Sequence, residues 1–583
     1  MYSSDGTTYD PIIDSIPNTG LIPDTNTFGQ LCLDATNILP EDLRYSNFYI
    51  KADIFNSDLK PEPVHVFFHN APEVKNGGIV DLNPDGVTID KFNDGEANDL
   101  SRYDTIYIPK CVTGIATSIF SEKFISDKTG VYKTIQNIIF ADRNGTCDVG
   151  ADAFSSTTNL VLTGGIYIGC GIYTCSATTT RARFFSAYSD YSLSITMGDV
   201  TILGNCSSRS SDSGGTAPAC FFSAYSGGTS ASTSIVMGGV TINGDCSSGG
   251  SGGGSGAGYF FSADSSGDSS VAITGDVTIN GNCSSGNGSS VASVSFFSAY
   301  SSNSSSDSSV VITGDVTING NCISSGSASP ACFFSAASSG DSSVAITGDV
   351  TINGNCSSGN SSSASAACFF SADSSGDSSV AITGDVTING NCSSTSANAA
   401  CFFSADSSGD SSLAITGDVT IDGNCSSSGD GTGEVYFFSA AGYSGDSSVA
   451  ITGDVTINGN CSSNNSGSST FINVACFFSA SYSSSSVDSS FAITGDVTIN
   501  GNCISSSSSG PACFFSVYNY SPTAIPITMG SVEFSSSAKI TLSGMSGYKY
   551  FFYATAASSS TITNFLINSA TFKTDTANGY PQN

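Results

Sequence analysis

The chain has 583 residues and is strongly acidic, with 17 Lys and Arg against 49 Asp and Glu and a formal net charge of −32. Such a charge excludes a surface that neutralises phosphates, so nucleic acids and anionic membranes are poor partners. Residues 210–538 contain no Lys, Arg or His, so the carboxylates of that stretch must be solvated, bound to cations or partly protonated.

Residues 1–100 have a mixed composition and hold most of the prolines. We expect a small globular or attachment domain there, with a strand at residues 63–68. His65 and His69 share parity on this strand and are candidate metal ligands, but the sequence shows no third ligand beside them. No segment approaches 18 consecutive apolar residues, so we expect no transmembrane segment, and no secretion signal is visible.

Two imperfect copies of one pattern follow, at residues 104–124 and 135–164. The apolar and proline positions of the pattern are Ile106, Ile108, Pro109, Val112, Ile115 and Phe120, then Ile138, Ile139, Val149, Ala153, Phe154 and Leu160. These positions resemble the BspA-like leucine-rich repeats of microbial surface proteins, although the second copy lacks the proline. The resemblance implies that residues 101–158 form a short leucine-rich-repeat segment.

A second, longer repeat occupies the chain from residue 159 onward. Its unit reads SVAITGDVTINGNC, then a Ser/Gly-rich insert, then CFFSA and a second variable insert. The Thr-Gly or Met-Gly step occurs in eleven copies, at Thr163, Met197, Met237, Thr274, Thr313, Thr347, Thr383, Thr416, Thr452, Thr494 and Met529. A period of roughly 37 residues is typical of a stacked solenoid.

The repeat unit has the apolar alternation of β-strands. In one copy, residues 271–274 and 277–279 alternate apolar and small or polar side chains, and Gly275 between them predicts a bend. A regular strand through Phe260 and Phe261 would place one ring inside and one outside. The exposed ring would then form a stripe able to bind a glycan or a partner protein.

We therefore predict an all-β fold, a parallel β-solenoid of about eleven coils at residues 159–535 with a degenerate C-terminal coil or cap at 536–583. Coils stacked every ~4.8 Å bury apolar faces that one copy alone cannot bury. The two variable inserts and the constant ITGDVTING segment predict a three-sided coil, with a two-sided β-arch as the alternative.

Stacking turns repeated polar residues into ladders. The asparagines of the GN step predict a structural amide ladder at a turn. The aspartates of the TGD step would lie about 5 Å apart and repel unless they are screened. Water or Ca²⁺ is the expected screen, although the repeat lacks a calcium-loop consensus. This candidate cation ladder comprises Asp276, Asp315, Asp349, Asp385, Asp418, Asp454 and Asp496, with Asp199 preceding them.

Twenty cysteines without CxxC spacing favour an oxidising, extracellular setting over zinc binding. We predict disulfides within six inserts: Cys206–Cys220, Cys322–Cys332, Cys356–Cys368, Cys392–Cys401, Cys461–Cys476 and Cys503–Cys513. Cys246 and Cys283 occupy the same position in adjacent coils, so they should pair vertically or remain thiols. Cys425 is the candidate for a free thiol or a link to a second molecule. The alternative is that all these cysteines are reduced and stacked as buried thiols.

A long array of near-identical coils provides length and rigidity rather than one specific pocket. We expect a non-enzymatic structural or adhesive rod, extracellular or on the cell surface, such as an adhesin, sheath or fibre component. Its partners would be copies of itself or a host or surface glycan or protein, and no cofactor other than Ca²⁺ is expected. The alternative is a carbohydrate-active enzyme or a virion tail-spike on a virion surface, because β-helices also host such chemistry.

Overall fold

The computed structural model describes residues 2–3, 49–50, 80–82 and 88–92 and most of residues 105–572. The larger segments beyond residue 105 that lie outside the described residues are 117–136, 150–159, 176–181, 211–218, 251–256, 286–292, 326–330, 360–365, 429–433, 465–474, 483–488, 506–511, 520–525, 543–548, 557–563 and 573–583. The strand predicted at 63–68, with His65 and His69, also lies outside them.

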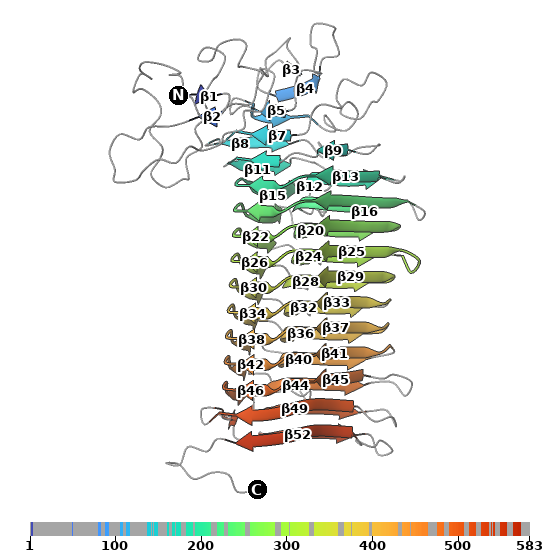
Figure 1. Cartoon of the computed structure of the whole chain (residues 1–583), viewed down its shortest axis with the longest axis vertical. Helices are drawn as coiled ribbons and strands as arrows, with labels where there is room; N and C mark the ends of the chain where they lie inside the picture. Colours follow the sequence, from blue (N-terminus) through green and yellow to red (C-terminus); the bar gives the residue numbers. More distant parts are fainter. Residues whose placement is uncertain are drawn as a thin grey trace, which may run out of the picture.

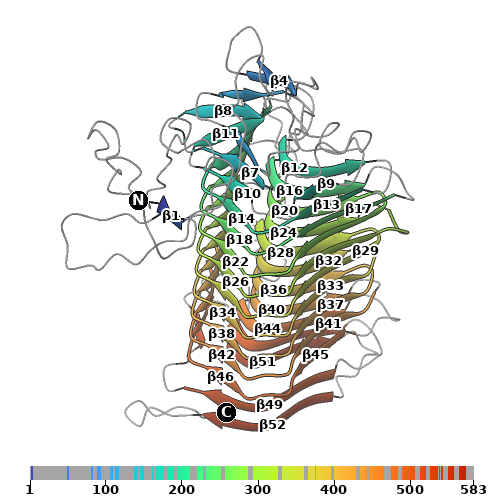
Figure 2. The same cartoon turned by 45° about the horizontal axis from the view of Figure 1, so that its top comes forward.

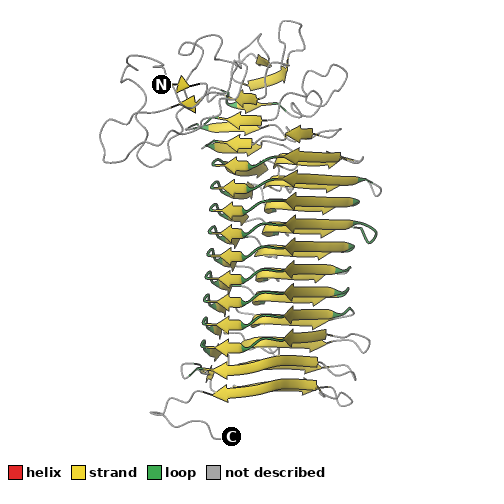
Figure 3. Cartoon of the chain, viewed as in Figure 1, coloured by secondary structure: helices red, strands yellow, loops and turns green. Residues whose placement is uncertain are grey.

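The described residues form a rod of stacked parallel strands (Figure 1). Strands from the N-terminal part of the chain lie at one end and those from the C-terminal part at the other. No helix occurs among the described residues (Figure 3). The predicted all-β parallel solenoid is therefore confirmed.

Each regular coil contains four strands. In one coil these are β21 (Asp268–Ile273), β22 (Val277–Ile279), β23 (Cys283–Ser285) and β24 (Val294–Ser301). The equivalent residues of successive coils pair in parallel and in register, so Val277 is opposite Val316 and Cys283 is opposite Cys322. Three sheets result, and they run along the rod as the three-sided coil predicts (Figure 2).

The 24-stranded sheet, called the Val/Ile sheet, receives two strands from each regular coil. The strands before the TGD step are β9 (Leu160–Leu162), β13 (Leu193–Met197), β17 (Ser232–Met237), β21, β25 (Asp307–Ile312), β29 (Asp341–Ile346), β33 (Ser378–Ile382), β37 (Ser411–Ile415), β41 (Ser447–Ile451) and β45 (Ser489–Ile493). Those after it are β10 (Ile166–Ile168), β14 (Val200–Ile202), β18 (Val240–Ile242), β22, β26 (Val316–Ile318), β30 (Val350–Ile352), β34 (Val386–Ile388), β38 (Val419–Ile421), β42 (Val455–Ile457) and β46 (Val497–Ile499). The long strands β49 (Pro526–Phe534) and β52 (Asn564–Phe572) run through both positions.

The 15-stranded Cys sheet contains the strands that begin at the GNC step in the regular coils. Its members are β3 (Val80–Leu82), β4 (Thr88–Phe92), β6 (Gly114–Ile115), β8 (Thr146–Val149), β11 (Ile172–Cys175), β15 (Asn205–Ser210), β19 (Cys246–Gly250), β23, β27 (Cys322–Ser324), β31 (Cys356–Ser358), β35 (Cys392–Ser394), β39 (Cys425–Ser427), β43 (Cys461–Ser463), β47 (Cys503–Ser505) and β50 (Ile540–Leu542).

The 11-stranded Phe sheet contains the strands with the Phe pair. Its members are β12 (Ala182–Ser189), β16 (Ala219–Ser226), β20 (Gly258–Ser265), β24, β28 (Ala331–Ser338), β32 (Ala367–Ser374), β36 (Ala400–Ser407), β40 (Val435–Gly442), β44 (Ala475–Tyr482), β48 (Ala512–Asn519) and β51 (Lys549–Ala556). A separate antiparallel pair is formed by β1 (Tyr2–Ser3) and β2 (Tyr49–Ile50).

The number of regular coils differs from the expected eleven. Eight coils, from β17 to β48, repeat the four-strand pattern with nearly constant bounds. Toward the C-terminal end, the two strands of the Val/Ile sheet fuse into β49 and then β52. Coils nearer the N-terminus have strands whose lengths depart from the pattern.

The segment that resembles leucine-rich repeats continues the same stack. Strand β5 (Thr105–Ile108) pairs in parallel with β7 (Asn137–Phe140), which pairs with β10 of the solenoid. Several pattern residues belong to the main core, namely Ile106, Ile108, Val112, Ile115, Ile138 and Val149. Ile139 is half-buried, and Pro109, Phe120, Ala153 and Phe154 lie outside the described residues.

The hydrophobic core is formed by the apolar side chains that alternate with small or polar ones along the strands. The burial of β21 alternates along its length, with Val271 and Ile273 buried and Ala272 half-buried. The same alternation recurs in β25, β29, β33, β41 and neighbouring strands, because period-two patterning places one set of side chains on the inner face. One continuous hydrophobic core therefore runs the length of the rod.

The prediction that one ring of each Phe pair lies outside is wrong. Phe333 and Phe334 are both fully buried in the main core, as are their equivalents in the neighbouring coils. The pairing register passes from Cys332 to Phe334 and omits Phe333, so the regular pleat is interrupted between the two rings. This local bend turns both rings inward, which also removes the predicted exposed aromatic stripe in these coils.

Glycine is required where the coils approach most closely. A Cβ on Gly354, in the Ile-Asn-Gly turn, would overlap the carbonyl oxygen of Gly320 in the preceding coil. The same overlap with the preceding glycine recurs at Gly244, Gly281, Gly320, Gly390, Gly423, Gly459 and Gly501. The turn can therefore stack at the strand spacing only without a side chain at this position.

Candidate functional site

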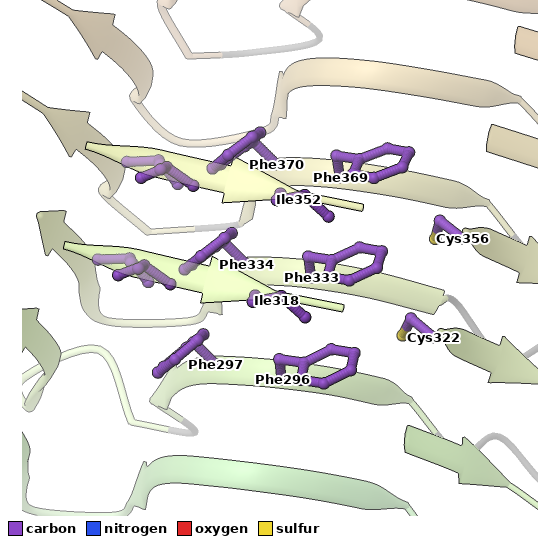
Figure 4. Close-up of a cluster of buried hydrophobic side chains, with 14 of the residues drawn as sticks. Phe296, Phe297, Ile318, Cys322, Phe333, Phe334, Ile352, Cys356, Phe369 and Phe370 are labelled. Atoms are coloured by element: carbon purple, nitrogen blue, oxygen red, sulfur yellow. The ribbon is translucent and has the colours of Figure 1, made fainter. Parts of the chain in front are cut away.

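The most distinctive chemical groups of the rod are two columns of cysteine side chains. The inner cysteine ladder follows the Cys sheet and comprises Cys206, Cys246, Cys283, Cys322, Cys356, Cys392, Cys425, Cys461 and Cys503, each in register with the next. These side chains belong to the main hydrophobic core. Figure 4 shows Cys322 and Cys356 one above the other beside the stacked Phe rings.

Each inner thiol points at the backbone of the Phe sheet. The Sγ of Cys356 donates to the carbonyl oxygen of Ala331 at 3.0 Å and to that of Cys368 at 3.3 Å. Cys392 makes the equivalent contacts at 3.0 and 3.2 Å. The Cys368 carbonyl directly precedes Phe369, where the pairing register is interrupted. The thiol therefore supplies a donor at a bend where a buried carbonyl would otherwise be costly.

Burial favours the protonated form of Cys356 and Cys392 in this inner ladder. Burial raises the pKa of the Cys356 and Cys392 thiols well above the ordinary value, since a thiolate would lose its hydration in the core. A thiol that remains protonated keeps the hydrogen it donates to the carbonyls. The inner ladder thus acts as a set of hydrogen-bond donors between two sheets.

The outer cysteine ladder lies on the other face of the Phe sheet. It comprises Cys220, Cys332, Cys368, Cys401, Cys476 and Cys513, each directly before a Phe pair. All of these except Cys220 form a cluster with Tyr436 that is separate from the main core. Ala366 and Ala399 pack against this cluster. The two cysteines of one insert therefore belong to different layers of the coil.

The structure does not join the cysteine pairs predicted within the inserts. All sixteen cysteines whose side chains the structure describes are thiols, because no two of their sulfur atoms lie at bonding distance. In the pair Cys322 and Cys332, the first sulfur faces the core and the second side chain belongs to the outer cluster, so the backbone of the Phe strand separates them. The alternative of stacked, buried thiols describes this arrangement.

The structure also shows where the three other predicted cysteines, Cys246, Cys283 and Cys425, lie. Cys246 and Cys283 are vertical neighbours, as predicted, and both are thiols. Cys425 is a thiol too, but it has vertical neighbours in Cys392 and Cys461 and is fully buried. Its burial places it away from the surface that a link to a second molecule would need.

Phenylalanine rings form two continuous stacks beside the inner thiols (Figure 4). Phe333 stacks on Phe369 with ring centroids 4.8 Å apart, and Phe334 stacks on Phe370 at 4.9 Å. The rings are nearly parallel because identical residues repeat at the strand spacing. These stacks fix the coil spacing from inside the core.

Asparagine amides link the coils at the turn, as predicted. The Asn355 amide nitrogen Nδ2 and its backbone N–H both donate to Oδ1 of Asn321, at 3.1 and 2.8 Å. A second column, which the sequence reasoning did not single out, links Asn353 to Asn319 at 2.7 Å. The two columns together satisfy polar groups that a chain reversal would leave unpaired.

The aspartate ladder is exposed, and each carboxylate has a partner in the next coil. The backbone N–H of Asp385 donates to Asp349 Oδ1 at 2.9 Å, and that of Asp418 donates to Asp385 Oδ1 at 2.8 Å. Charge-assisted hydrogen bonds to backbone N–H groups thus stabilise acidic residues that have no basic neighbour. The described residues contain no group of three or more His, Cys, Asp or Glu side chains suited to a metal ion.

Arg143 is a further buried residue that the sequence reasoning missed. It is only 6 % exposed, donates to the carbonyl oxygen of Val112, and lies 5.3 Å from the centre of the Tyr173 ring. Tyr173 occupies the cysteine position of its coil, in register with Cys147 and Cys206. Burial raises the pKa of the Cys147 thiol to about 11. The change from Cys to Tyr at this position is the signal that could have indicated the Arg143 contact.

Comparisons with known proteins leave the family open. No family model, curated protein or solved structure matches the chain. The resemblance to BspA-like repeats therefore stays an expectation. Among the described residues there is no helix of the length and apolarity that a membrane crossing requires.

Proposed function

We propose that this chain is a non-enzymatic structural or adhesive rod, extracellular or on the cell surface, that assembles with copies of itself. The observation that carries the proposal is the unbroken repetition of eight coils from β17 to β48. A catalytic or small-molecule site needs a few residues that differ from their neighbours, whereas these coils present nearly the same side chains at each register position. Repetition of this kind suits a spacer or a repetitive binding face.

The contacts between coils support a rigid rod. Neighbouring regular coils are joined by three sheets, two Phe stacks and the Asn column, and most of them also by the Asp column. Bending or separating two coils would break all of these contacts at once. Stiffness along the axis is the property that a sheath, stalk or fibre component requires.

The C-terminal end of the stack supports self-assembly. Strands β50, β51 and β52 pair with β47, β48 and β49, and no described strand pairs with their other edges. Unpaired edges of parallel strands accept further strands by backbone hydrogen bonding. At the other end, the antiparallel pair of β3 and β4 precedes β6 in the Cys sheet, so the two ends differ. Such a difference favours polar, head-to-tail growth.

Electron microscopy of the full-length protein tests this proposal. We expect straight rods of constant width, and lengths that increase in steps as the protein concentration is raised. Compact particles at every concentration would contradict the rod, and rods of one fixed length would contradict self-assembly. Release of new reducing ends from a panel of polysaccharides would instead support an enzyme.

A further inference from the structure

We infer that Cys332, Cys368 and Cys401 form an oxidation site, at which one vertical disulfide covalently joins two neighbouring coils of the rod. This outer cysteine triplet consists of three consecutive members of the outer cysteine ladder. The inference does not depend on the rod having an adhesive or a structural role.

The register of the Phe sheet provides the required geometry. Cys332 is directly opposite Cys368, and Cys368 is directly opposite Cys401. The three side chains lie in one cluster on the outer face of the sheet. Adjacent strands are ~4.8 Å apart, and a disulfide accepts Cα atoms about 4.4–6.8 Å apart. The strand spacing of each pair of neighbours therefore falls within the Cα range of a disulfide.

The inner cysteine ladder has similar spacing but different surroundings. Its thiols lie in the main core, and each donates to backbone carbonyls of the Phe sheet, as Cys356 does at 3.0 and 3.3 Å. Oxidation would remove these donors and leave buried carbonyls without a partner. An oxidant must therefore enter the main core to reach the inner thiols, and their oxidation would also cost these hydrogen bonds.

The remaining outer cysteines provide comparisons within the same chain. Cys476 and Cys513 are also in register, but both are fully buried, and Cys476 donates to the Phe478 carbonyl oxygen at 2.9 Å. Cys220 has Arg183 and Tyr259 as its vertical neighbours, so no cysteine is in register with it in either adjacent coil. Cys332, Cys368 and Cys401 are buried as well, at 4 %, 3 % and 2 % exposure.

The middle thiol is the expected nucleophile. Hydrogen bonds from Cys332 and from Cys401 lower the pKa of the Cys368 thiol, because both neighbours can donate to its thiolate. The bond to Cys368 in turn raises the pKa of Cys332 and of Cys401, and burial adds to this effect. Thiolates, rather than thiols, attack disulfides.

The oxidant in this step is a small-molecule disulfide. The Cys368 thiolate attacks one of its sulfur atoms, forms a mixed disulfide and releases one small thiolate. The thiolate of Cys332 or Cys401 then attacks the Cys368 sulfur, forms the vertical disulfide and releases the second small thiolate. Two protein thiols are oxidised, one small disulfide is reduced to two thiols, and the two cysteine protons end on the released thiolates. Three cysteines can form only one such bond, so one thiol remains.

Asp-N protease, which cuts before aspartate, distinguishes the possible bonds. It places the two cysteines of each of three inserts in one fragment, with Cys322 and Cys332 in residues 315–340, Cys356 and Cys368 in 349–372, and Cys392 and Cys401 in 385–405. The reduced full-length protein is treated with 2-hydroxyethyl disulfide, its remaining thiols are alkylated, and the unfolded chain is digested without reductant. A bond within one insert stays inside a fragment, whereas a vertical bond links two fragments.

We expect fragment 349–372 to become linked to 315–340 or to 385–405, before any link involving Cys476 appears. Cys368→Ser should abolish both links. Cys332→Ser should leave only the link to 385–405, and Cys401→Ser only the link to 315–340.

Persistence of the links in Cys368→Ser would assign them to the inner ladder and overturn the inference. A bond inside one fragment, or no linked fragments at all, would overturn it as well. Circular dichroism before oxidation establishes that each variant folds.

Discussion

Phe370 lies in the middle of a ring stack, and its replacement by Ala should open the rod locally. Its ring is fully buried, with the Phe334 centroid at 4.9 Å on one side and the Phe403 centroid at 5.0 Å on the other. Phe→Ala in a core costs about 3–5 kcal/mol, and two stacking contacts of roughly 0.5–1.5 kcal/mol each form part of that loss. Because ~1.4 kcal/mol corresponds to a factor of ten, local opening should become roughly a hundred to several thousand times more frequent.

The effect should be confined to nearby coils, since each coil of a solenoid contacts only its neighbours. Hydrogen exchange followed by mass spectrometry should therefore show faster exchange in β28, β32 and β36 and little change in β44 and beyond. Phe491→Val is the matched control, because the preceding coil already has Val449 at that position. Unchanged exchange in β32, or an equal loss of protection in every coil, would refute this reasoning.

Four further predictions concern the polar and backbone features of the coils. Gly354→Ala should lower the unfolding temperature, because its Cβ would overlap the Gly320 carbonyl oxygen, whereas Gly145→Ala, with nothing within 4 Å, should have little effect. Asn355→Ala should cost about 1–3 kcal/mol by leaving the amide ladder unpaired. Asn355→Asp should cost less in the same denaturant titration, because Asp245 already occupies an equivalent position and accepts from Asn282. Trypsin should leave residues 210–539 intact because its only sites lie outside them, and a proteinase K digest that leaves no resistant core would contradict the ordered solenoid. If cations screen the aspartate ladder, a chelator at low ionic strength should lower the unfolding temperature and added Ca²⁺ should restore it, and no response to either would exclude that role.

Much of the architecture was predictable from the repeat itself. A regular period with recurring Gly-Asp and Gly-Asn steps indicates stacking, and apolar alternation in segments such as 277–279 determines which side chains face the core. Once equivalent residues stack in register, every conserved polar position becomes a column. The Asn355 contact with Asn321 therefore follows from the sequence, because the repeat places like residues one strand apart.

Other features depend on backbone geometry that no local pattern encodes. Both rings of the Phe333 and Phe334 pair face inward because the pairing register omits Phe333, and a simple alternation rule cannot anticipate that bend. The partner of each Asp carboxylate is a backbone N–H in the next coil, such as that of Asp385, and a backbone donor leaves no signal in the amino-acid sequence.

The cysteines show most clearly which features the sequence determines and which depend on the tertiary structure. The sequence determined that two cysteines flank six of the inserts, and closeness along the chain made Cys322 and Cys332 seem natural partners. Tertiary structure decided otherwise, because the turn from the Cys sheet into the Phe sheet places their sulfurs on opposite faces of one strand. Each sulfur then has its nearest equivalent one coil away, where stacking rather than sequence proximity controls its chemistry.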